Sequence, residues 1–166
     1  MEISVTPAAV GDVAELAVVA AATFPLACPD SVAAEDIAAF VATHLSEARF
    51  AEYLAAPERV VLAAREEGRI IGYAMLIRGT GDGDGVELSK IYVLPSHHSA
   101  GAAAALLRSG IDWASGTGAA RLWLGVNQRN ARAQRFYRKQ GFEFTGTRTF
   151  RLGGHIEHDY VMARPL

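Results

Sequence analysis

The chain has very little cysteine. A single residue, Cys28, stands among 166, so no disulfide can form within the chain. A lone cysteine behaves as a small hydrophobic side chain unless the fold places a base beside its thiol, and no motif around Cys28 supplies one. We therefore expect a packed thiol at this position rather than a catalytic nucleophile.

Positive charge is not in excess either. The 16 lysine and arginine residues are balanced by 18 aspartate and glutamate residues, which gives a formal net charge of −2. Proteins that bind nucleic acid usually present a basic face. One basic cluster, at residues 132–139, has the spacing of a solvated helix face. No nucleic-acid partner is expected.

The sequence shows neither a secretory signal nor a metal-binding motif. Residues 1–7 lack the basic-then-apolar order of a signal peptide, and no apolar run approaches the roughly 20 residues that cross a membrane. The glycine-rich segment 79–85, with Asp82 and Asp84, lacks the glutamate that closes a calcium loop. His155 and His158 would point to opposite faces of a strand. We expect a cytoplasmic protein with no membrane partner and no metal.

Hydrophobic residues, in contrast, make up 51% of the chain, enough for the core of one domain over residues 1–166. Strand patterns fall at residues 3–6, 59–65, 69–77, 86–94, 121–126, 142–147 and 155–162. Helical patterns fall at residues 10–23, 46–55, 101–114 and 131–140, and a further one runs from a cap at Asp30-Ser31 to His44. Hairpins that lead into a β-α-β unit predict an α/β fold, in which helices cover a mixed sheet.

The segment from Glu87 to Leu107 has the order strand, short loop, helix. Pro95 ends the strand, and the helix begins at Gly101 after a loop of small residues. The first N–H groups of a helix have no partner within it and carry partial positive charge. Small residues let a phosphate approach these groups closely. The segment predicts a diphosphate site made of backbone, although an ordinary strand–loop–helix connection has the same order.

A second segment, Asn130 to Phe142, predicts a helix with a groove on one face. Asn130 is a favourable N-cap, and Gly141 is a favourable stop. Asn130 and Tyr137 are separated by nearly two helical turns, so their side chains share a face and lie about 10 Å apart. Ala133 leaves room between them. The groove suits an extended thiol cofactor, with Asn130 on its amide arm and Tyr137 near its sulfur.

The first segment resembles motif A of the GNAT acetyltransferase superfamily, a strand followed by Gln/Arg-x-x-Gly-x-Gly/Ala. His98, Gly101 and Ala103 stand at the three defined positions. Two positions depart from the pattern, because Ser99 and Ala100 replace a frequent glycine and a frequent basic residue. The loss of one phosphate-facing charge predicts weaker cofactor binding than is usual in the family, since a charge-assisted contact contributes roughly 1.5–3 kcal/mol.

The second segment resembles motif B of the same superfamily, Asn-x-x-Ala-x-x-x-Tyr-x-x-x-Gly-Phe. All five defined positions match: Asn130, Ala133, Tyr137, Gly141 and Phe142. The resemblance implies the GNAT fold, a mostly antiparallel mixed sheet of six to seven strands with four or five helices, and acetyl-CoA as acetyl donor. The cofactor contacts that it implies are Ile91, Tyr92, Val93, His98, Ser99, Ala100, Gly101, Ala102, Ala103, Asn130, Ala133 and Tyr137.

Acetyl transfer to an amine needs a base, because an alkylamine with a pKa of about 10 is protonated at neutral pH. The resemblance makes Glu87, on the cofactor strand, the candidate base, acting directly or through water. A surface carboxylate is the alternative reading of this residue. The resemblance also implies a backbone N–H near Val93 as donor to the oxyanion, and Tyr137 as the acid that protonates the departing thiolate. No nucleophile accompanies either motif, so we expect direct transfer.

The acceptor is expected to be a small primary amine such as a polyamine, because both ends of the chain look similar to the polyamine-acetylating branch of the superfamily. Three alternatives stay open: an acetyltransferase that acts on a protein lysine or N-terminus, a non-catalytic CoA-binding module, and a different α/β nucleotide-binding domain. Family members are often dimers, so the resemblance makes a homodimer one option, and the sequence leaves the oligomeric state open.

Overall fold

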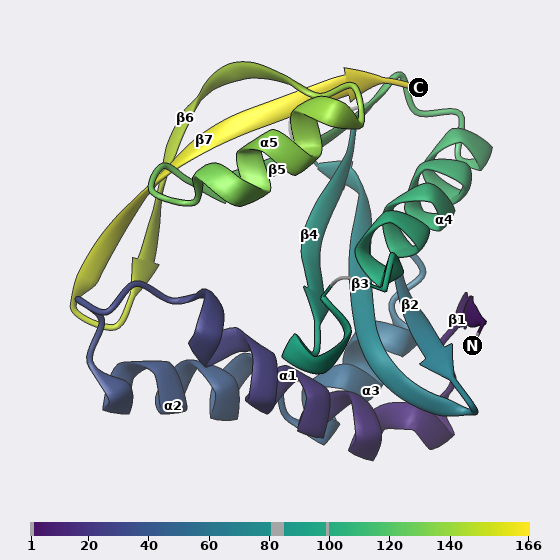
Figure 1. The fold of residues 1–166 in the computed structure, drawn as a ribbon, viewed down its shortest axis with the longest axis horizontal. Coiled ribbons are helices and arrows are strands. Elements are labelled where there is room, and N and C mark those ends of the chain that lie inside the picture. Colours follow the sequence, from purple (N-terminus) through teal and green to yellow (C-terminus); the bar gives the residue numbers. More distant parts are fainter. Residues whose placement is uncertain (1, 81–84, 99) are drawn as a thin grey trace.

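The structure is a computed structural model that describes residues 2–80, 85–98 and 100–166. Its strands and helices, shown in Figure 1, follow the chain in this order: β1 (Ile3–Pro7), η1 (Val10–Asp12), α1 (Val13–Ala27), α2 (Ala34–His44), α3 (Glu47–Ala55), β2 (Arg59–Glu66), β3 (Arg69–Thr80), β4 (Gly85–Val93), η2 (Pro95–His97), α4 (Ala102–Gly116), β5 (Arg121–Asn127), α5 (Ala131–Lys139), β6 (Glu143–Leu152) and β7 (His155–Pro165).

The strands form one sheet with the order β1-β2-β3-β4-β5-β7-β6. Neighbouring strands are antiparallel except for β4 and β5, which are parallel. Seven strands and five α-helices in the described residues confirm the predicted α/β fold, a mostly antiparallel mixed sheet.

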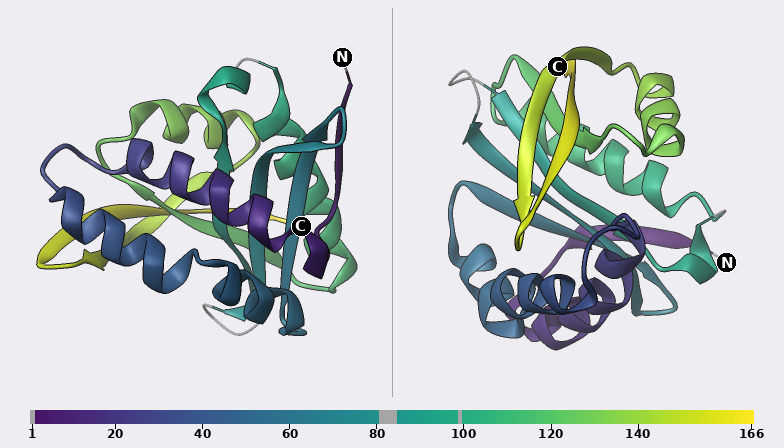
Figure 2. Two further views of the ribbon diagram at one scale, coloured as in Figure 1. Left: turned by 90° about the horizontal axis from the view of Figure 1, so that it is seen from below. Right: turned by 90° about the vertical axis from the view of Figure 1, so that its left-hand side faces the viewer.

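Helices cover both faces of the sheet, as Figure 2 shows. Helices α1, α2 and α3 cover one face, here called the α1 face, where Leu16, Phe50 and Tyr73 are fully buried. Helices α4 and α5 cover the other, here called the α4 face, where Leu106 and Leu122 are fully buried. Two separate hydrophobic cores therefore hold the sheet, and the sheet divides whatever binds on one face from whatever binds on the other.

Two predicted boundaries among the first helices were wrong. Helix α1 does not stop before Pro25 but runs to Ala27. Pro25 has no N–H, so the carbonyl of Ala21 loses its hydrogen bond within the helix. Ala21 is exposed, and water can replace that bond. Helix α2 begins at Ala34 rather than at the expected cap, because the chain first turns to bury Val32 in the core.

The C-terminal strands β6 and β7 are longer than predicted, since antiparallel pairing extends them beyond the residues that show a strand pattern. Residues 81–84 of the expected glycine-rich turn, with Asp82 and Asp84, lie outside the described residues.

Helix α1 and the turn before it carry an unusually apolar stretch. Residues Val10–Ala27, with a mean hydropathy of 1.6, are long and apolar enough to cross a membrane by length and composition. The expectation that no run approaches this length was therefore wrong. In the fold, Leu16 and Val19 from this stretch are buried on the sheet, whereas Val18 and Leu26 are 68% and 66% exposed. A helix packed on a core passes the same test of composition.

Candidate active site

Strands β4 and β5 separate in the middle of the sheet. They pair over three residues each, Gly85–Glu87 against Arg121–Trp123. Beyond Glu87, β4 continues along β3 to Val93, whereas β5 continues along β7 to Asn127. Figure 1 shows β4 diverging from the half of the sheet formed by β5, β7 and β6. The backbone groups along this gap have no partner strand.

The backbone of Ile91 and Val93 faces this gap. The amide of Leu94 donates to the carbonyl of Ile71 at 2.8 Å. In an antiparallel pair every second residue bonds to the neighbouring strand, so this bond shows which residues of β4 bond to β3. Leu94 and Tyr92 therefore bond to β3, and the residues that alternate with them, Val93 and Ile91, direct their backbone groups toward β5. Of the three predicted cofactor residues on this strand, Ile91 and Val93 direct their N–H groups into the gap, whereas the carbonyl of Val93 already accepts a hydrogen bond from Nε2 of His98.

A β-bulge at Ser89 determines which side chains of β4 lie on each face. The register with β3 shifts by one residue there, so Ser89 has no partner. Leu88 before the bulge and Val93 after it both pack in the core of the α4 face. Glu87 and Tyr92 consequently share the α1 face, which two residues five positions apart would not do on a regular strand.

The loop after β4 contains the residues predicted to bind pyrophosphate. Gly101 is the N-cap of α4 and has a φ of 82°, in the left-handed region that favours glycine. The first amide bonded within the helix is that of Ala105, which donates to the carbonyl of Gly101 at 3.0 Å. The N–H groups of residues 101–104 therefore have no helical partner, and groups of this kind at a helix start are suited to bind an anion.

The other predicted loop residues contribute differently. The Ala102 side chain is fully buried in the core, so only its backbone can face a ligand, and the Ala103 side chain is half-buried. Ala100 is exposed, and Ser99 lies outside the described residues. His98 folds back on the strand, where its Nε2 donates to the carbonyl of Val93 at 2.9 Å. It closes the loop onto β4 instead of extending toward a phosphate.

Substitution of Gly101 by alanine is expected to weaken acetyl-CoA binding several-fold and to destabilise the fold by about 1 kcal/mol, because a side chain disfavours left-handed backbone. No atom lies within 4 Å of the added Cβ, so the effect comes from the backbone conformation alone. Gly116→Ala, in the last turn of the same helix and also in open space, is the matched control. Calorimetric titration with acetyl-CoA would contradict this expectation if both variants bound like the wild type.

Helix α5 presents Tyr137 to the α4 face of the sheet. Asn130 caps the helix as predicted, since its Oδ1 accepts the amide of Ala133 at 3.1 Å. The Tyr137 ring is buried between Phe136 and Phe142, with ring centroids 5.4 and 5.7 Å away. Burial raises the pKa of the Tyr137 phenol well above its usual range, and the nearby Tyr92 adds to this effect. Tyr137 is therefore a neutral hydrogen-bond donor throughout the physiological pH range.

On the α1 face, an arginine links the predicted base to a second carboxylate. Arg148 of β6 places its NH1 atom 3.6 Å from Oε2 of Glu87. Its Nε donates to Oδ2 of Asp159, on β7, at 3.4 Å. The Glu87 and Asp159 side chains are only 17% and 11% exposed, whereas that of Arg148 is 36% exposed. Burial raises the pKa of Asp159, and the adjacent Arg148 partly opposes this shift.

A third carboxylate, Glu157, extends this cluster along β7. Its Oε2 accepts Nδ2 of Asn127 at 3.2 Å. Its Oε1 is buried and has no hydrogen-bond partner, although Nε2 of His155 lies 3.3 Å away. Two buried acids and a half-buried one thus line the α1 face beside the gap. Within the described residues, no group of three or more His, Cys, Asp or Glu side chains is arranged to hold a metal ion.

Sequence reasoning found the cofactor side of this site but missed most of the opposite side. Arg148, Glu157 and Asp159 belong to neither of the two motifs. One signal was available. A glycine inside a strand often marks a place where another group approaches the backbone closely. Gly125 lies in the middle of β5, and a Cβ at this position would overlap the Arg148 guanidinium.

Cys28, at the end of α1, has the properties expected of a packed thiol. Its Sγ donates to the carbonyl of Phe24 at 3.3 Å. Burial, with a smaller contribution from Glu157, raises its pKa from 9.0 to about 11. Because the thiolate is the reactive form, alkylation by iodoacetamide at pH 7.5 is expected to be about 100-fold slower than at an ordinary cysteine, and to accelerate only as the pH approaches 11. A half-maximal rate near pH 9 or below would contradict this.

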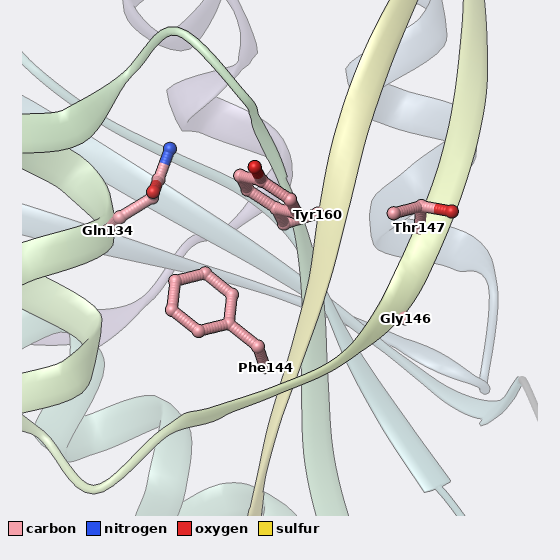
Figure 3. A pocket seen from close by; sticks show the side chains of 5 residues that line it. All are labelled: Gln134, Phe144, Gly146, Thr147 and Tyr160. Atoms are coloured by element: carbon pink, nitrogen blue, oxygen red, sulfur yellow. The ribbon is translucent and has the colours of Figure 1, made fainter.

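Two open hollows lie on either side of the β6–β7 pair. One, of about 420 Å³, is lined by Gln134, Phe144, Gly146, Thr147 and Tyr160. Figure 3 shows the side chains of Gln134, Phe144 and Tyr160 converging there between α5 and the β6–β7 pair. The other, of about 280 Å³, lies between α2 and the β6–β7 turn, with Phe40, His44 and Arg151 in its lining. Neither hollow includes the residues of the gap.

Comparison with known proteins finds acetyltransferases in both the family models and the related sequences. Residues 28–142 match the model of the Acetyltransferase (GNAT) family. The chain is 63% identical over 155 residues to an uncharacterized N-acetyltransferase of Mycobacterium tuberculosis, covering 93% of this chain and 98% of that protein. It is 31% identical over 113 residues to a streptothricin acetyltransferase of Streptomyces lavendulae, covering 66% of this chain and 59% of that one.

Solved structures resemble the fold over its whole length. The PaiA N-acetyltransferase from Thermoplasma acidophilum, in complex with coenzyme A, superposes with a TM-score of 0.86 at 19% identity and covers 100% of both chains. The ribosomal-protein-S18-alanine N-acetyltransferase from Escherichia coli superposes with a TM-score of 0.74 at 21% identity, covering 99% of this chain and 94% of that one.

Proposed function

This chain belongs to the acetyltransferase (GNAT) family and is an acetyl-CoA-dependent N-acetyltransferase; from this premise we propose that its acceptor is a small primary amine with more than one positive charge, such as a polyamine. We further propose that acetyl-CoA occupies the gap between β4 and β5, with its pyrophosphate at the start of α4 and its sulfur near Tyr137. The acceptor then approaches from the α1 face.

The charge of the α1 face supports a cationic acceptor. Glu157 and Asp159 are each 8% exposed, and the Oε1 atom of Glu157 has no hydrogen-bond partner. Nε2 of His155 lies 3.3 Å from this oxygen without a hydrogen bond to it. An acceptor ammonium would supply that bond, and a buried carboxylate is costly unless its oxygens are hydrogen-bonded. Arg148 offsets part of the negative charge, and Lys90, whose ammonium lies 5.9 Å from the centre of the Phe40 ring, borders the cluster. This buried carboxylate oxygen, which accepts no hydrogen bond, is the observation that carries the proposal.

Transfer begins with the acceptor ammonium. Glu87, or a water that it holds, takes a proton from it and leaves a neutral amine nitrogen to attack the thioester carbonyl carbon. The negative charge that develops on the carbonyl oxygen needs a fixed donor. The N–H groups of Ile91 and Val93, which face the gap, are suited to that role. As the carbon–sulfur bond breaks, Tyr137 donates its proton to the departing thiolate. The second proton of the new amide nitrogen then passes through water to the tyrosinate and restores the phenol.

A thermal-shift assay followed by a thiol-release assay tests this proposal. Acetyl-CoA is expected to raise the melting temperature, and free CoA is expected to appear fastest with polyamines. The amine panel also includes a lysine peptide, a peptide with a free N-terminus, and streptothricin, the compound in the name of one relative. Faster turnover with either peptide would favour a protein acceptor. Stabilisation without thiol release from any amine would favour a non-catalytic CoA-binding module.

A further inference from the structure

The two halves of the sheet are joined by very little backbone at the candidate site. Strands β1 to β4 form one half, and strands β5, β7 and β6 form the other. Among the residues that the structure describes, three backbone pairs between β4 and β5 connect the two halves. Glu87 is the last residue of β4 that pairs with β5, so the two strands diverge immediately after the candidate base. The position of this carboxylate relative to the acids on β7 depends on what else spans the two halves.

One side chain spans them. Arg148 is on the edge strand β6, directly opposite Asp159 on β7, which in turn lies opposite Asn127 on β5. From this edge its guanidinium reaches over β7 and β5 to within 3.6 Å of Glu87 on β4. It therefore links the outermost strand of one half to the innermost strand of the other.

The path of Arg148 requires a glycine beneath it. A Cβ on Gly125 would overlap the Cζ, Nε and NH2 atoms of Arg148, so any larger residue there must displace the guanidinium. Trp123 is the next residue of β5 on the same face as Gly125. The Arg148 guanidinium lies over its ring, with Cζ 5.6 Å from the ring centre. An aromatic ring at this distance favours a guanidinium and restricts its orientation.

We propose that Arg148 is the positioning residue of the acceptor site: held over Gly125 and Trp123, it fixes Glu87 and Asp159 as one unit that receives the acceptor ammonium. The role given to the acceptor rests on the function proposed above. Arg148 does not contact the reacting atoms in this scheme. It acts by setting the distance between the two carboxylates and by favouring the ionised form of Asp159 beside the incoming cation.

Other charged groups act on the same carboxylates and remain in every variant. Lys90 on β4 acts on Glu87, whereas Tyr92 on β4 and Glu157 and His158 on β7 face Asp159. Arg59 on β2 lies near Lys90, and the neutral thiol of Cys28 lies near Glu157. Removal of Arg148 takes away the cation that contacts both Glu87 and Asp159. Because a nearby cation favours the charged form of an acid, its loss must raise the pH at which Asp159 loses its proton.

The experiment compares Arg148→Met, Arg148→Lys and Gly125→Ala with the wild type. Arg148→Met and Gly125→Ala are expected to lower kcat/KM for the amine at least tenfold and to move the acid limb of its pH profile upward by about half a unit or more. KM for acetyl-CoA is expected to change by less than twofold, because the cofactor contacts lie elsewhere. Arg148→Lys, which keeps the charge, is expected to retain the pH profile.

Gly146→Ala is the matched control for the glycine substitution. It lies on β6 with open space around its Cα and is expected to behave as the wild type. Arg69→Met, at an exposed position at the start of β3, is the control for loss of an arginine. An unchanged pH profile in both Arg148→Met and Gly125→Ala would overturn the proposal, since a merely structural residue would lower the rate without moving the profile.

A second measurement does not depend on catalysis. Titration of the Asp159 carboxyl carbon by NMR is expected to show a pKa higher in Arg148→Met and in Gly125→Ala than in the wild type, and unchanged in Gly146→Ala. If the wild type releases no CoA with any amine, the proposed function fails, and this titration still decides whether Arg148 controls the carboxylates. A titration curve that is the same in all variants would overturn the positioning role even in an active enzyme.

Discussion

Replacement of Tyr137 by phenylalanine is expected to lower kcat about 100-fold, within the range typical of a lost general acid, and to leave KM for acetyl-CoA within about twofold. The ring keeps its contacts with Phe136 and Phe142, so the fold should be retained. Only the hydroxyl is lost, and with it the donor to the departing sulfur. Because burial raises the pKa of Tyr137, the wild type should also show no loss of kcat from phenol ionisation below about pH 10.

Steady-state kinetics with the best amine of the panel provide the measurement. Tyr160→Phe is the matched control, since this second tyrosine is half-buried near α5 but lies away from the gap. Its kcat should stay within twofold of the wild-type value. A Tyr137→Phe enzyme with unchanged kcat would remove Tyr137 from the acid role.

Replacement of Glu87 by glutamine is expected to lower kcat/KM for the amine about 100-fold at pH 7. The defect should shrink as the pH rises toward 10, because an alkylamine then loses its proton in solution and no longer needs a base. The pH profile of the variant should therefore keep rising where the wild-type profile has levelled off. Glutamine preserves the size of the side chain, so the effect reports on the charge and the proton.

Glu143→Gln, at an exposed position on β6, is the control and should follow the wild type at every pH. Profiles of Glu87→Gln and wild type that run parallel, with no recovery at high pH, would contradict the role of Glu87 as base. In that case Asp159, which is buried and has a raised pKa, is the next residue to test as asparagine.

The cofactor side of the site could be predicted from the sequence because it depends on local features. Pro95, Gly101 and Asn130 mark the ends of elements, and the structure puts those ends where the patterns indicated. The backbone N–H groups at the start of α4 follow from the existence of the helix alone. Tyr137 follows from helical spacing and from packing on one face.

The acceptor side could not be predicted in the same way, because it depends on strand pairing between distant residues. Nothing in the local pattern of β4 shows that pairing with β5 stops at Glu87, or that Ser89 forms a bulge. The approach of Arg148 to Glu87 joins residues 61 positions apart through the order of strands in the sheet. Periodicity identifies which residues share a strand face but gives neither the neighbouring strand nor the register.

The first helices illustrate a different limit. Asp30-Ser31 has the composition of a cap, yet α2 begins at Ala34 after Val32 has turned into the core. Burial of one valine here outweighed the local preference for a capping side chain. In α1, by contrast, exposure of Ala21 made Pro25 tolerable within the last turn.

A crystal structure of the protein with coenzyme A would test the proposed arrangement directly. We expect the pantetheine between β4 and β5, the pyrophosphate on the N–H groups of residues 101–104, and the sulfur within hydrogen-bond reach of the Tyr137 hydroxyl. Coenzyme A bound instead in the hollow lined by Gln134, Phe144 and Tyr160, with the gap between the strands empty, would contradict the mechanism.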